Sequence, residues 1–374
     1  MRIGLVARCL NTDHVRGMGR YVHELLRHSA AVPGLEWRLF GDDSRHPMHA
    51  PAGLRGEVDV FTFRGDRFQL WEQLGLPLRL RRHQIDVLHC TEGTLPWWQP
   101  VPTVVTLHDT LAWQEHDGSA QAHRYFDQWL PAALHRCAHV ITISESSRRD
   151  ILAKWPRLAD KLTVIPHGIG DEYLQPDGPA MPSPVQAGLG LAPYLVYLGG
   201  PLARKRFDWA ERVLQALQMP ALQLVACGFG AEARATAMQQ VPPDMRAQVH
   251  FPPFLSQPEL LALYRGAAAV LYPTLYEGFG FPVIEAQAAG APVLFSPISS
   301  LQELVGPLSL LAPSEDLDGW CAAVREALAL GAARPERAAQ ARAWAQRFSW
   351  RHSFEAHQQV YRAATSHCRA DNNN

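Results

Sequence analysis

The first half of the chain alternates short apolar runs with amphipathic segments. Its apolar runs are rich in β-branched residues and almost continuously hydrophobic, as expected of strands that are covered on both faces. We predict strands at residues 2–7, 37–40, 58–63, 86–89, 103–108, 139–144 and 162–166. Helical patterns lie between them at residues 21–28, 126–137 and 145–153, and Ser144 is the expected N-cap of the third. This alternation predicts a parallel, doubly wound sheet.

The same alternation of strand and helix patterns resumes in the second half. A segment rich in Pro and Gly, at residues 175–193, separates the two halves. Helical patterns at residues 208–217 and 258–266 separate further apolar runs. Strands are predicted at residues 194–200, 222–228, 249–254, 268–274 and 291–296. Residues 348–364 form an amphipathic helical pattern, and the terminal RADNNN is expected to be disordered.

The predicted fold class is therefore α/β, with two Rossmann-like αβα domains that face a cleft. We predict an N-terminal domain at 1–175, a linker at 176–193, a C-terminal domain at 194–347, and a crossover helix with a disordered tail at 348–374. Ligands of such sheets bind beyond the carboxyl ends of the strands.

Composition narrows the function classes. The 374 residues have a formal net charge of −1, which carries no global signal for nucleic-acid binding. The six cysteines show no CxxC spacing, so buried reduced thiols are expected rather than a metal knuckle or a disulfide framework. The N-terminus lacks a signal-peptide pattern, and no apolar run approaches the roughly 20 residues that span a bilayer. We expect a cytoplasmic protein.

The stretch LYEGFGFPVIEAQAAGAP, at residues 275–292, contains several candidate ligand-binding groups. Glu277 precedes the turn Gly278–Phe279–Gly280, and Glu285 lies about one turn inside the following helix. The glycines allow close backbone approach, and the N–H groups of the turn and the helix start attract an anion or sugar oxygens. A glycosidase pair, which needs two carboxylates roughly 5–10 Å apart across one bond, and a simple helix cap are the alternatives. We favour one ligand held along its length, with Glu277 on sugar hydroxyls and Glu285 on a ribose diol.

Other motifs follow other predicted strands. Arg204, Lys205 and Arg206 come after YLGGPLA, in a chain whose lysines are Lys154, Lys161 and Lys205. Three adjacent cations are often only a solvated face, but these follow a strand end with two glycines. Gly17-Met-Gly19 opens a helix and offers amides to a phosphate, although it lacks a full GxGxxG pattern.

Taken together, these motifs resemble those of retaining GT-B glycosyltransferases of family 4. The resemblance covers nearly the whole chain and rests on the order and spacing of pieces that are weak singly. They are GMGRYVHELL, WEQLGLPLRLRR, DVLH, VVTLHD, ISESSRRDIL, VIPHG, YLGGPLARKR, EGFGFPVIEAQAAGAPV and SSLQELVG.

The resemblance implies roles for particular residues. Arg204 and Lys205 match the pair that clamps the donor diphosphate, and they would stabilise the charge of the leaving group. The loop with Gly17 and Gly19 would approach the donor phosphate, and His108 would orient the donor sugar. No Asp-x-Asp metal site stands at a suitable strand end, so we expect metal-independent chemistry without a cofactor.

Several positions carry weaker expectations. Asp109 is expected to hold the imidazole or the acceptor, and His89 and Glu92 are candidates on the acceptor side. His167 replaces the asparagine that is more usual in the family, near the expected hinge. The aromatic and basic positions of the N-terminal half are either ordinary packing and solvated charge, or an acceptor-stacking or membrane-docking surface; they are Arg79, Arg81, Arg82, Trp97 and Trp98.

We therefore expect retaining transfer of a hexose from a nucleotide sugar, with GDP-mannose favoured, to a glycan or lipid-linked acceptor in surface polysaccharide assembly. The departing phosphate would accept the acceptor's proton, so no protein nucleophile is required. The partners expected are this donor and acceptor and, peripherally, the inner membrane, with no nucleic acid. A nucleotide-sugar epimerase and a non-catalytic sugar-nucleotide binder remain as alternatives.

Overall fold

The computed structural model describes residues 1–13, 15, 17–63, 70–114, 123–176, 178 and 181–371. The chain forms two compact units. Unit 1 contains Met1–Gly168 and Ser349–Asn374, and unit 2 contains Ile169–Phe348. The last segment of the chain thus returns to the N-terminal unit, as the predicted crossover helix requires.

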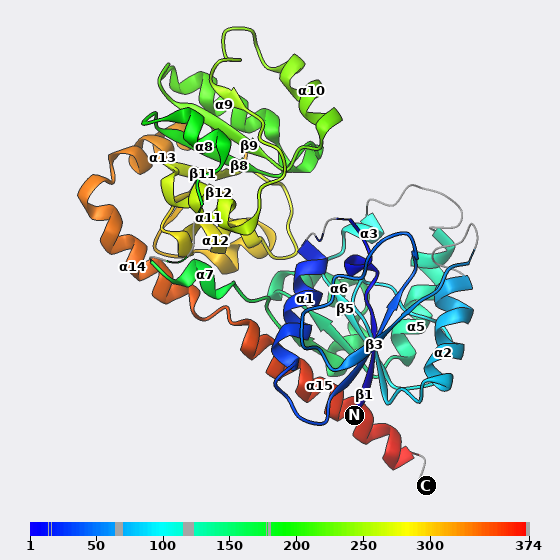
Figure 1. Cartoon of the computed structure of the whole chain (residues 1–374). Coiled ribbons are helices and arrows are strands. Elements are labelled where there is room, and N and C mark those ends of the chain that lie inside the picture. The colour runs from blue at the N-terminus through cyan, green and yellow to red at the C-terminus, as the bar shows by residue number, and fades with distance from the viewer. Residues whose placement is uncertain are drawn as a thin grey trace. The chain divides into compact units, whose positions relative to one another are not determined.

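Unit 1 is built on a seven-stranded sheet in which every neighbouring pair is parallel (Figure 1). Its central strands are fully buried, which explains their nearly continuous hydrophobicity. In sheet order the strands are β3 (Gly56–Val60), β2 (Glu36–Gly41), β1 (Arg2–Val6), β4 (Val87–Cys90), β5 (Thr103–Leu107), β6 (His139–Thr142) and β7 (Leu162–Val164).

Helices cover this sheet, and Ser144 caps α6 (Glu145–Lys154) as predicted, by accepting a hydrogen bond from the Ser147 N–H. The long C-terminal helix α15 (Trp350–Asp371) packs against α1 (Gly17–Ser29), β4 and β5 (Figure 1). The remaining helical elements of the unit are η1 (Arg8–Leu10), α1 (Gly17–Ser29), η2 (Trp71–Gly75), α2 (Leu76–Arg82), α3 (Leu111–Gln114), η3 (Tyr125–Trp129), α5 (Leu130–Arg136), α6 (Glu145–Lys154) and η4 (Pro156–Lys161).

Unit 2 repeats the plan with a six-stranded parallel sheet around its own apolar core. In sheet order its strands are β10 (Val249–His250), β9 (Gln223–Cys227), β8 (Tyr194–Leu198), β11 (Ala269–Tyr272), β12 (Val293–Phe295) and β13 (Ser309–Leu311). Its helical elements are α7 (Asp171–Leu174), α8 (Pro184–Leu189), η5 (Ala203–Lys205), α9 (Phe207–Leu217), α10 (Ala231–Gln240), α11 (Gln257–Gly266), α12 (Phe281–Ala289), η6 (Ser299–Leu304), α13 (Leu317–Ala329), η7 (Gly331–Ala333) and α14 (Arg334–Ala345).

The structure differs from the sequence-based predictions at several boundaries. The units divide after Gly168 rather than near residue 175, and the expected linker belongs to unit 2. That segment contains α8, because Ser183 accepts a hydrogen bond from the Gln186 N–H and Pro184 occupies the first turn, where proline is tolerated. Helix α15 continues to Asp371, so Arg369–Asp371 are helical and the prediction of disorder is wrong there. Residues 372–374 lie outside the described part of the chain.

Two smaller differences concern unit 2 and helix α1. The sequence analysis missed β13 and made β10 too long, because β10 is only Val249–His250. Helix α1 begins at Gly17, before the predicted start. Over the residues that the structure describes, no helix combines the length and hydrophobicity needed to cross a membrane.

Candidate functional site

In unit 2, the predicted cation loop lies between β8 and α9 and meets the segment that follows β11. The Lys205 ammonium contacts the Glu277 carboxylate and donates a hydrogen bond to the Tyr272 hydroxyl at 3.2 Å. The Arg204 guanidinium donates to the Tyr276 carbonyl at 3.0 Å and lies 3.7 Å from Glu277 Oε1. Of the four residues predicted to act on the donor's diphosphate or sugar (His108, Arg204, Lys205 and Glu277), the fold therefore brings together the last three, beyond the carboxyl ends of two adjacent strands.

The third cation of the run is held elsewhere. Arg206 has a left-handed backbone and forms ion pairs with Asp208 at 3.1 Å and with Glu315 at 2.7 Å. Lys205 and Glu277 are instead mostly covered, with side chains 14% and 11% exposed. Arg204 and Lys205 thus share one carboxylate, whereas Arg206 belongs to another ion-pair cluster.

The predicted glycine turn is fixed by its backbone. Ser300 donates hydrogen bonds to the carbonyls of Glu277 and Phe279, at 2.7 and 2.9 Å. Gly280 has a φ of +108°, a backbone conformation that favours glycine, and a Cβ there would lie 2.5 Å from Leu301 Cδ2, so the leucine would have to move. The Phe279 ring is buried, which leaves its backbone as the part that can serve a ligand.

Glu285 lies inside helix α12 and is only 3% exposed. Its carboxylate accepts a hydrogen bond from the buried Tyr264 hydroxyl at 3.2 Å. Burial, followed by the charge of Glu285, raises the pKa of Tyr264 well above its ordinary value, so the hydroxyl stays a donor. The carboxylate is therefore held in one orientation, as a residue that positions a ligand must be.

Two glycines, at the ends of two neighbouring strands, lie against each other, which the sequence analysis did not predict. Gly200 follows β8 and Gly228 follows β9, and both have positive φ. A Cβ on Gly200 would lie 2.6 Å from the Gly228 carbonyl oxygen. The signal in the sequence was a glycine directly after each buried strand.

In unit 1, His108 directly follows β5 and is half-buried. Its Nε2 lies 2.8 Å from the Thr91 carbonyl oxygen. Because a carbonyl only accepts, Nε2 carries the proton and Nδ1 is the acceptor nitrogen. Burial lowers the pKa of His108, so the neutral imidazole is the form to consider. The carboxylate of Asp109 accepts from the Leu111 N–H at 2.9 Å.

Gly17 and Gly19 both lie in the first turn of α1, but only one is sterically required. A Cβ on Gly19 would lie 2.6 Å from the Cys9 carbonyl oxygen, whereas one on Gly17 would have open space. Gly19 therefore lets α1 approach η1, the segment at the end of β1.

The acceptor-side prediction is wrong for His89. Its side chain is fully buried within β4 and is hydrogen-bonded to Tyr361 of α15 and to Thr106 of β5. Glu92 lies two residues beyond the end of β4, and its side chain is 13% exposed, whereas His89 is fully buried.

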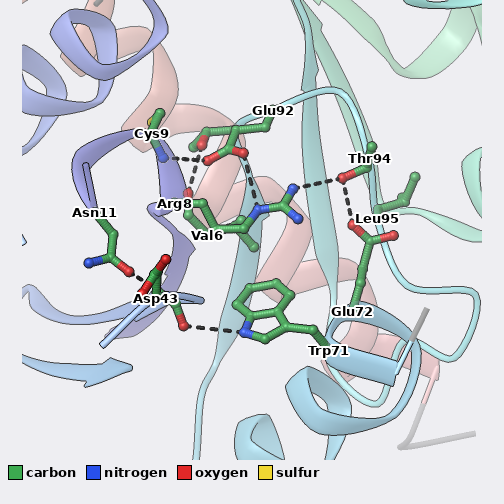
Figure 2. A network of polar contacts seen from close by, with 12 residues as sticks. Val6, Arg8, Cys9, Asn11, Asp43, Trp71, Glu72, Glu92, Thr94 and Leu95 are labelled. Atoms are coloured by element: carbon green, nitrogen blue, oxygen red, sulfur yellow. Dashed lines mark hydrogen bonds and ion pairs between the residues drawn. The ribbon is translucent and has the colours of Figure 1, made fainter. Parts of the chain in front are cut away.

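Glu92 belongs to a buried polar network that sequence reasoning missed (Figure 2). Arg8 donates to Glu92 at 3.1 Å and to the Thr94 hydroxyl at 3.2 Å. Thr94 in turn donates to Glu72 at 2.5 Å, and the Tyr125 hydroxyl donates to the same carboxylate at 2.8 Å. Burial opposes the charge on Arg8, but Glu92 and Glu72 outweigh it and raise the pKa of the guanidinium.

The deeper members of this network hold its outer member in place. Burial raises the pKa of Glu72 despite the nearby Arg8 charge. Glu92 accepts a second hydrogen bond from the Cys9 N–H at 2.8 Å, and its side chain is 13% exposed. The network thus presents one fixed carboxylate at the carboxyl ends of β1 and β4.

Two family models match this chain, one in each half of the sequence. A model described as Glycosyltransferase Family 4 matches residues 15–173, and one described as Glycosyl transferases group 1 matches residues 192–329. The chain is 29% identical over 362 residues to the O-antigen chain mannosyltransferase B of Escherichia coli, which covers 89% of this chain and 92% of that protein.

Two further likenesses span almost the whole length. Glycogen synthase of Mycobacterium tuberculosis is 31% identical over 409 residues, covering 97% of this chain and 95% of that protein. The solved structure of sucrose-phosphate synthase from Thermosynechococcus elongatus aligns with a TM-score of 0.74 at 22% identity, over 96% of this chain and 98% of that one. The second likeness is evidence for the fold alone.

Proposed function

Since the chain belongs to glycosyltransferase family 4 and has a GT-B fold, we propose that it transfers a hexose with retention from a nucleotide-sugar donor to a glycan or lipid-linked acceptor. The observation that carries this proposal is the group formed by Arg204, Lys205 and Glu277 at the ends of β8 and β11. Similarity to an O-antigen chain mannosyltransferase supports mannose as the transferred sugar and surface polysaccharide assembly as the setting, and we propose GDP-mannose as the donor.

The chemistry assigned to the group is electrostatic. Lys205 and Arg204 meet the donor diphosphate and stabilise the negative charge that grows on it as the bond to the anomeric carbon breaks. Glu277, whose charge they neutralise in the absence of donor, accepts hydrogen bonds from sugar hydroxyls. Because two cations already serve the leaving group, the proposal requires neither a metal ion nor a cofactor.

The remaining steps need no protein nucleophile. An acceptor hydroxyl oxygen forms the new bond to the anomeric carbon on the face from which the diphosphate leaves. The departing phosphate oxygen takes the hydroxyl proton, which balances the reaction. Glu285 holds the ribose diol, His108 orients the donor sugar as a neutral imidazole, and Glu92 lies on the acceptor side.

A lipid-linked acceptor would place unit 1 against a membrane, and one face of this unit suits that contact. Leu74 and Leu78 lie one helical turn apart on the continuous helix η2–α2 and are 47% and 51% exposed. Trp97 is 46% exposed and its backbone N–H donates to the Gln73 side chain, so this residue lies beside the same helix. We call Leu74, Leu78 and Trp97 the apolar face.

Arginines border this apolar face. The Arg136 guanidinium lies over the Trp97 ring, 3.9 Å from its centroid, and the Arg81 guanidinium lies 5.0 Å from the centroid of Trp98. Apolar side chains flanked by arginine suit an anionic bilayer surface, where each basic residue adds about 1 kcal/mol. We therefore propose peripheral contact with the cytoplasmic membrane through this face.

The double variant Leu74→Gln/Leu78→Gln tests the membrane proposal. It should bind phosphatidylglycerol-containing vesicles about 30-fold more weakly, since each half-exposed leucine contributes about 1 kcal/mol on insertion. Co-sedimentation measures this, and Leu191→Gln, at an equally apolar and fully exposed position of unit 2, is the matched control. Equal binding by both variants would contradict the assignment of the face.

Thermal unfolding with a panel of GDP-, UDP- and dTDP-sugars tests the catalytic proposal. A donor present at 100 times its Kd should add about 2.7 kcal/mol to stability, and Glu285→Ala should lose most of this gain. Release of the nucleotide only when an acceptor is present indicates transfer. Turnover without an acceptor would indicate an epimerase, and binding without any turnover would indicate a non-catalytic binder.

A further inference from the structure

We propose that Tyr21 and His357 are positioning residues for His108, so that the C-terminal helix α15 sets the geometry of the donor-orienting imidazole. This inference rests on the role proposed for His108. It concerns residues of unit 1 alone, from four elements that are far apart in the sequence. The evidence is a continuous series of buried hydrogen bonds and a stack of rings.

The series begins and ends on α15. Its successive donor–acceptor distances are 2.7, 2.8, 3.1, 2.7 and 2.7 Å. Every participating side chain is fully buried, so an unmade hydrogen bond would have no water to replace it. In order, the groups are the Tyr361 hydroxyl, His89, the Thr106 hydroxyl, the Tyr21 hydroxyl, His357 and the Ser353 carbonyl.

A single backbone carbonyl sets the direction of the whole series. Because the Ser353 carbonyl only accepts, His357 must donate from Nδ1. Burial lowers the pKa of His357 to about 4, so the ring is neutral and its Nε2 accepts from the Tyr21 hydroxyl. Tyr21 has then used its proton, and the Thr106 hydroxyl must donate to it.

The same reasoning fixes the hydrogen-bond directions at the other end of the series, from Thr106 to Tyr361. Thr106 has used its proton on Tyr21, so His89 donates to it from Nε2. The neutral His89 ring therefore accepts at Nδ1, and the Tyr361 hydroxyl is the donor. Each donor has one acceptor and each acceptor one donor, so this arrangement holds α15, β4, β5 and α1 in one register.

Tyr21 connects this series to His108. Its ring meets the His108 imidazole edge-on, with centroids 5.4 Å apart and an interplanar angle of 82°. The other neighbours of the ring include His167 at 4.8 Å, which in turn lies 5.5 Å from Trp350 of α15. Thr106 adds a second link, because it precedes His108 by two residues on β5.

Loss of the Tyr21 hydroxyl alone would leave His357 without its donor and Thr106 without its acceptor, while the ring against His108 remains. The register between α1, β5 and α15 would then relax, and His108 with it. Small displacements of a positioning group are costly, since about 1 Å is worth roughly 10²-fold in rate.

The test compares Tyr21→Phe with Tyr173→Phe. Tyr173 is a fully buried tyrosine of unit 2 whose hydroxyl donates to Gln257 at 2.8 Å, so Tyr173→Phe likewise removes a hydrogen-bonding hydroxyl from a buried ring. We expect Tyr21→Phe to lower kcat by about tenfold with the donor-induced thermal shift retained. Tyr173→Phe should lose stability and keep kcat.

A conservative pair refines the test at His357. Glutamine has an amide oxygen that can accept from Tyr21, whereas leucine cannot, so His357→Gln should keep most of the activity that His357→Leu loses. Equal kcat for wild type, Tyr21→Phe and His357→Leu would overturn the inference and leave the series as packing only.

Imidazole ¹⁵N spectra provide a readout that does not depend on turnover. Wild-type His108 should show a protonated Nε2 and a bare Nδ1, and its signals should shift or broaden in Tyr21→Phe but not in Tyr173→Phe. Unchanged His108 signals in Tyr21→Phe would also overturn the inference. If wild-type protein transfers no sugar from any donor, the proposed function fails, and these spectra still decide the positioning of His108.

Discussion

Replacement of Lys205 by alanine should lower kcat by about 10²-fold or more, which corresponds to the loss of one preorganised donor to the leaving group. The ammonium is held in place by Glu277 and by the Tyr272 hydroxyl before any donor arrives, so little reorganisation is needed during reaction. Steady-state transfer from the preferred nucleotide sugar measures the effect. Because Lys205 is expected to act mainly in the transition state, kcat should fall more than KM rises.

The neighbouring Arg206 is the matched control for Lys205. It carries the same charge one position along the chain, but its guanidinium is bound to Asp208 and Glu315. Arg206→Gln should therefore retain kcat within about twofold, as for a residue outside the reacting group. Lys205→Ala leaves Arg204 at 3.7 Å from Glu277, so the buried carboxylate keeps a cation and the variant should fold. Near wild-type turnover in Lys205→Ala would refute the clamp.

Local sequence patterns predicted the architecture well because the hydrophobicity of each strand depends directly on whether its two faces are covered. Buried parallel strands such as β4 and β5 must be apolar on both faces, and the sequence shows that directly. Helix α8 was missed because Pro184 follows a Pro- and Gly-rich stretch, and only the Ser183 cap distinguishes a helix start from a loop. Strand β13 has three residues, too few to display a period.

The residues of the candidate site likewise fall into two groups, those that local sequence patterns predicted and those that they did not. Arg204, Lys205 and Glu277 were predictable because each lies in the loop segment that comes after a buried strand, β8 or β11, and parallel strand ends meet at one edge of a sheet. The network of Arg8, Glu72 and Glu92 was not, since its members come from distant segments and each alone resembles a surface charge. Long-range pairing of buried polar groups has no local signature.

The burial of several histidines in unit 1 was also not predictable from local sequence patterns. Their burial leads to a prediction of how stability depends on pH. Sequence alone placed His89 toward the acceptor and left the role of His167 open, whereas the structure buries both, together with His357. Burial is the largest cause that lowers the pKa of each ring. The charge of Arg20, and a positive charge on His108 or His357 if either were protonated, further oppose protonation of these rings, while the Ser353 carbonyl favours it at His357.

Unit 1 should consequently lose stability as the pH falls from about 6.5 to about 4. An unfolded histidine binds a proton below about pH 6.5, whereas native His357 does so only near pH 4. Within this window the unfolded state binds more protons, so the free energy of unfolding rises with pH and falls with acid. For His357 alone, the loss between pH 7 and pH 5 is about 2 kcal/mol.

Denaturant unfolding of wild type and His357→Gln at both pH values isolates this contribution. The variant has one fewer buried imidazole to protonate, so the difference in stability between pH 7 and pH 5 should shrink by about 2 kcal/mol. His352→Gln, at an exposed position of the same helix, should leave the difference unchanged. An identical pH dependence in His357→Gln and wild type would mean that this ring is protonated in the native state as readily as in the unfolded chain. The hydrogen-bond direction deduced for the series from α15 through Tyr21 would then fail as well, because that direction requires a neutral His357.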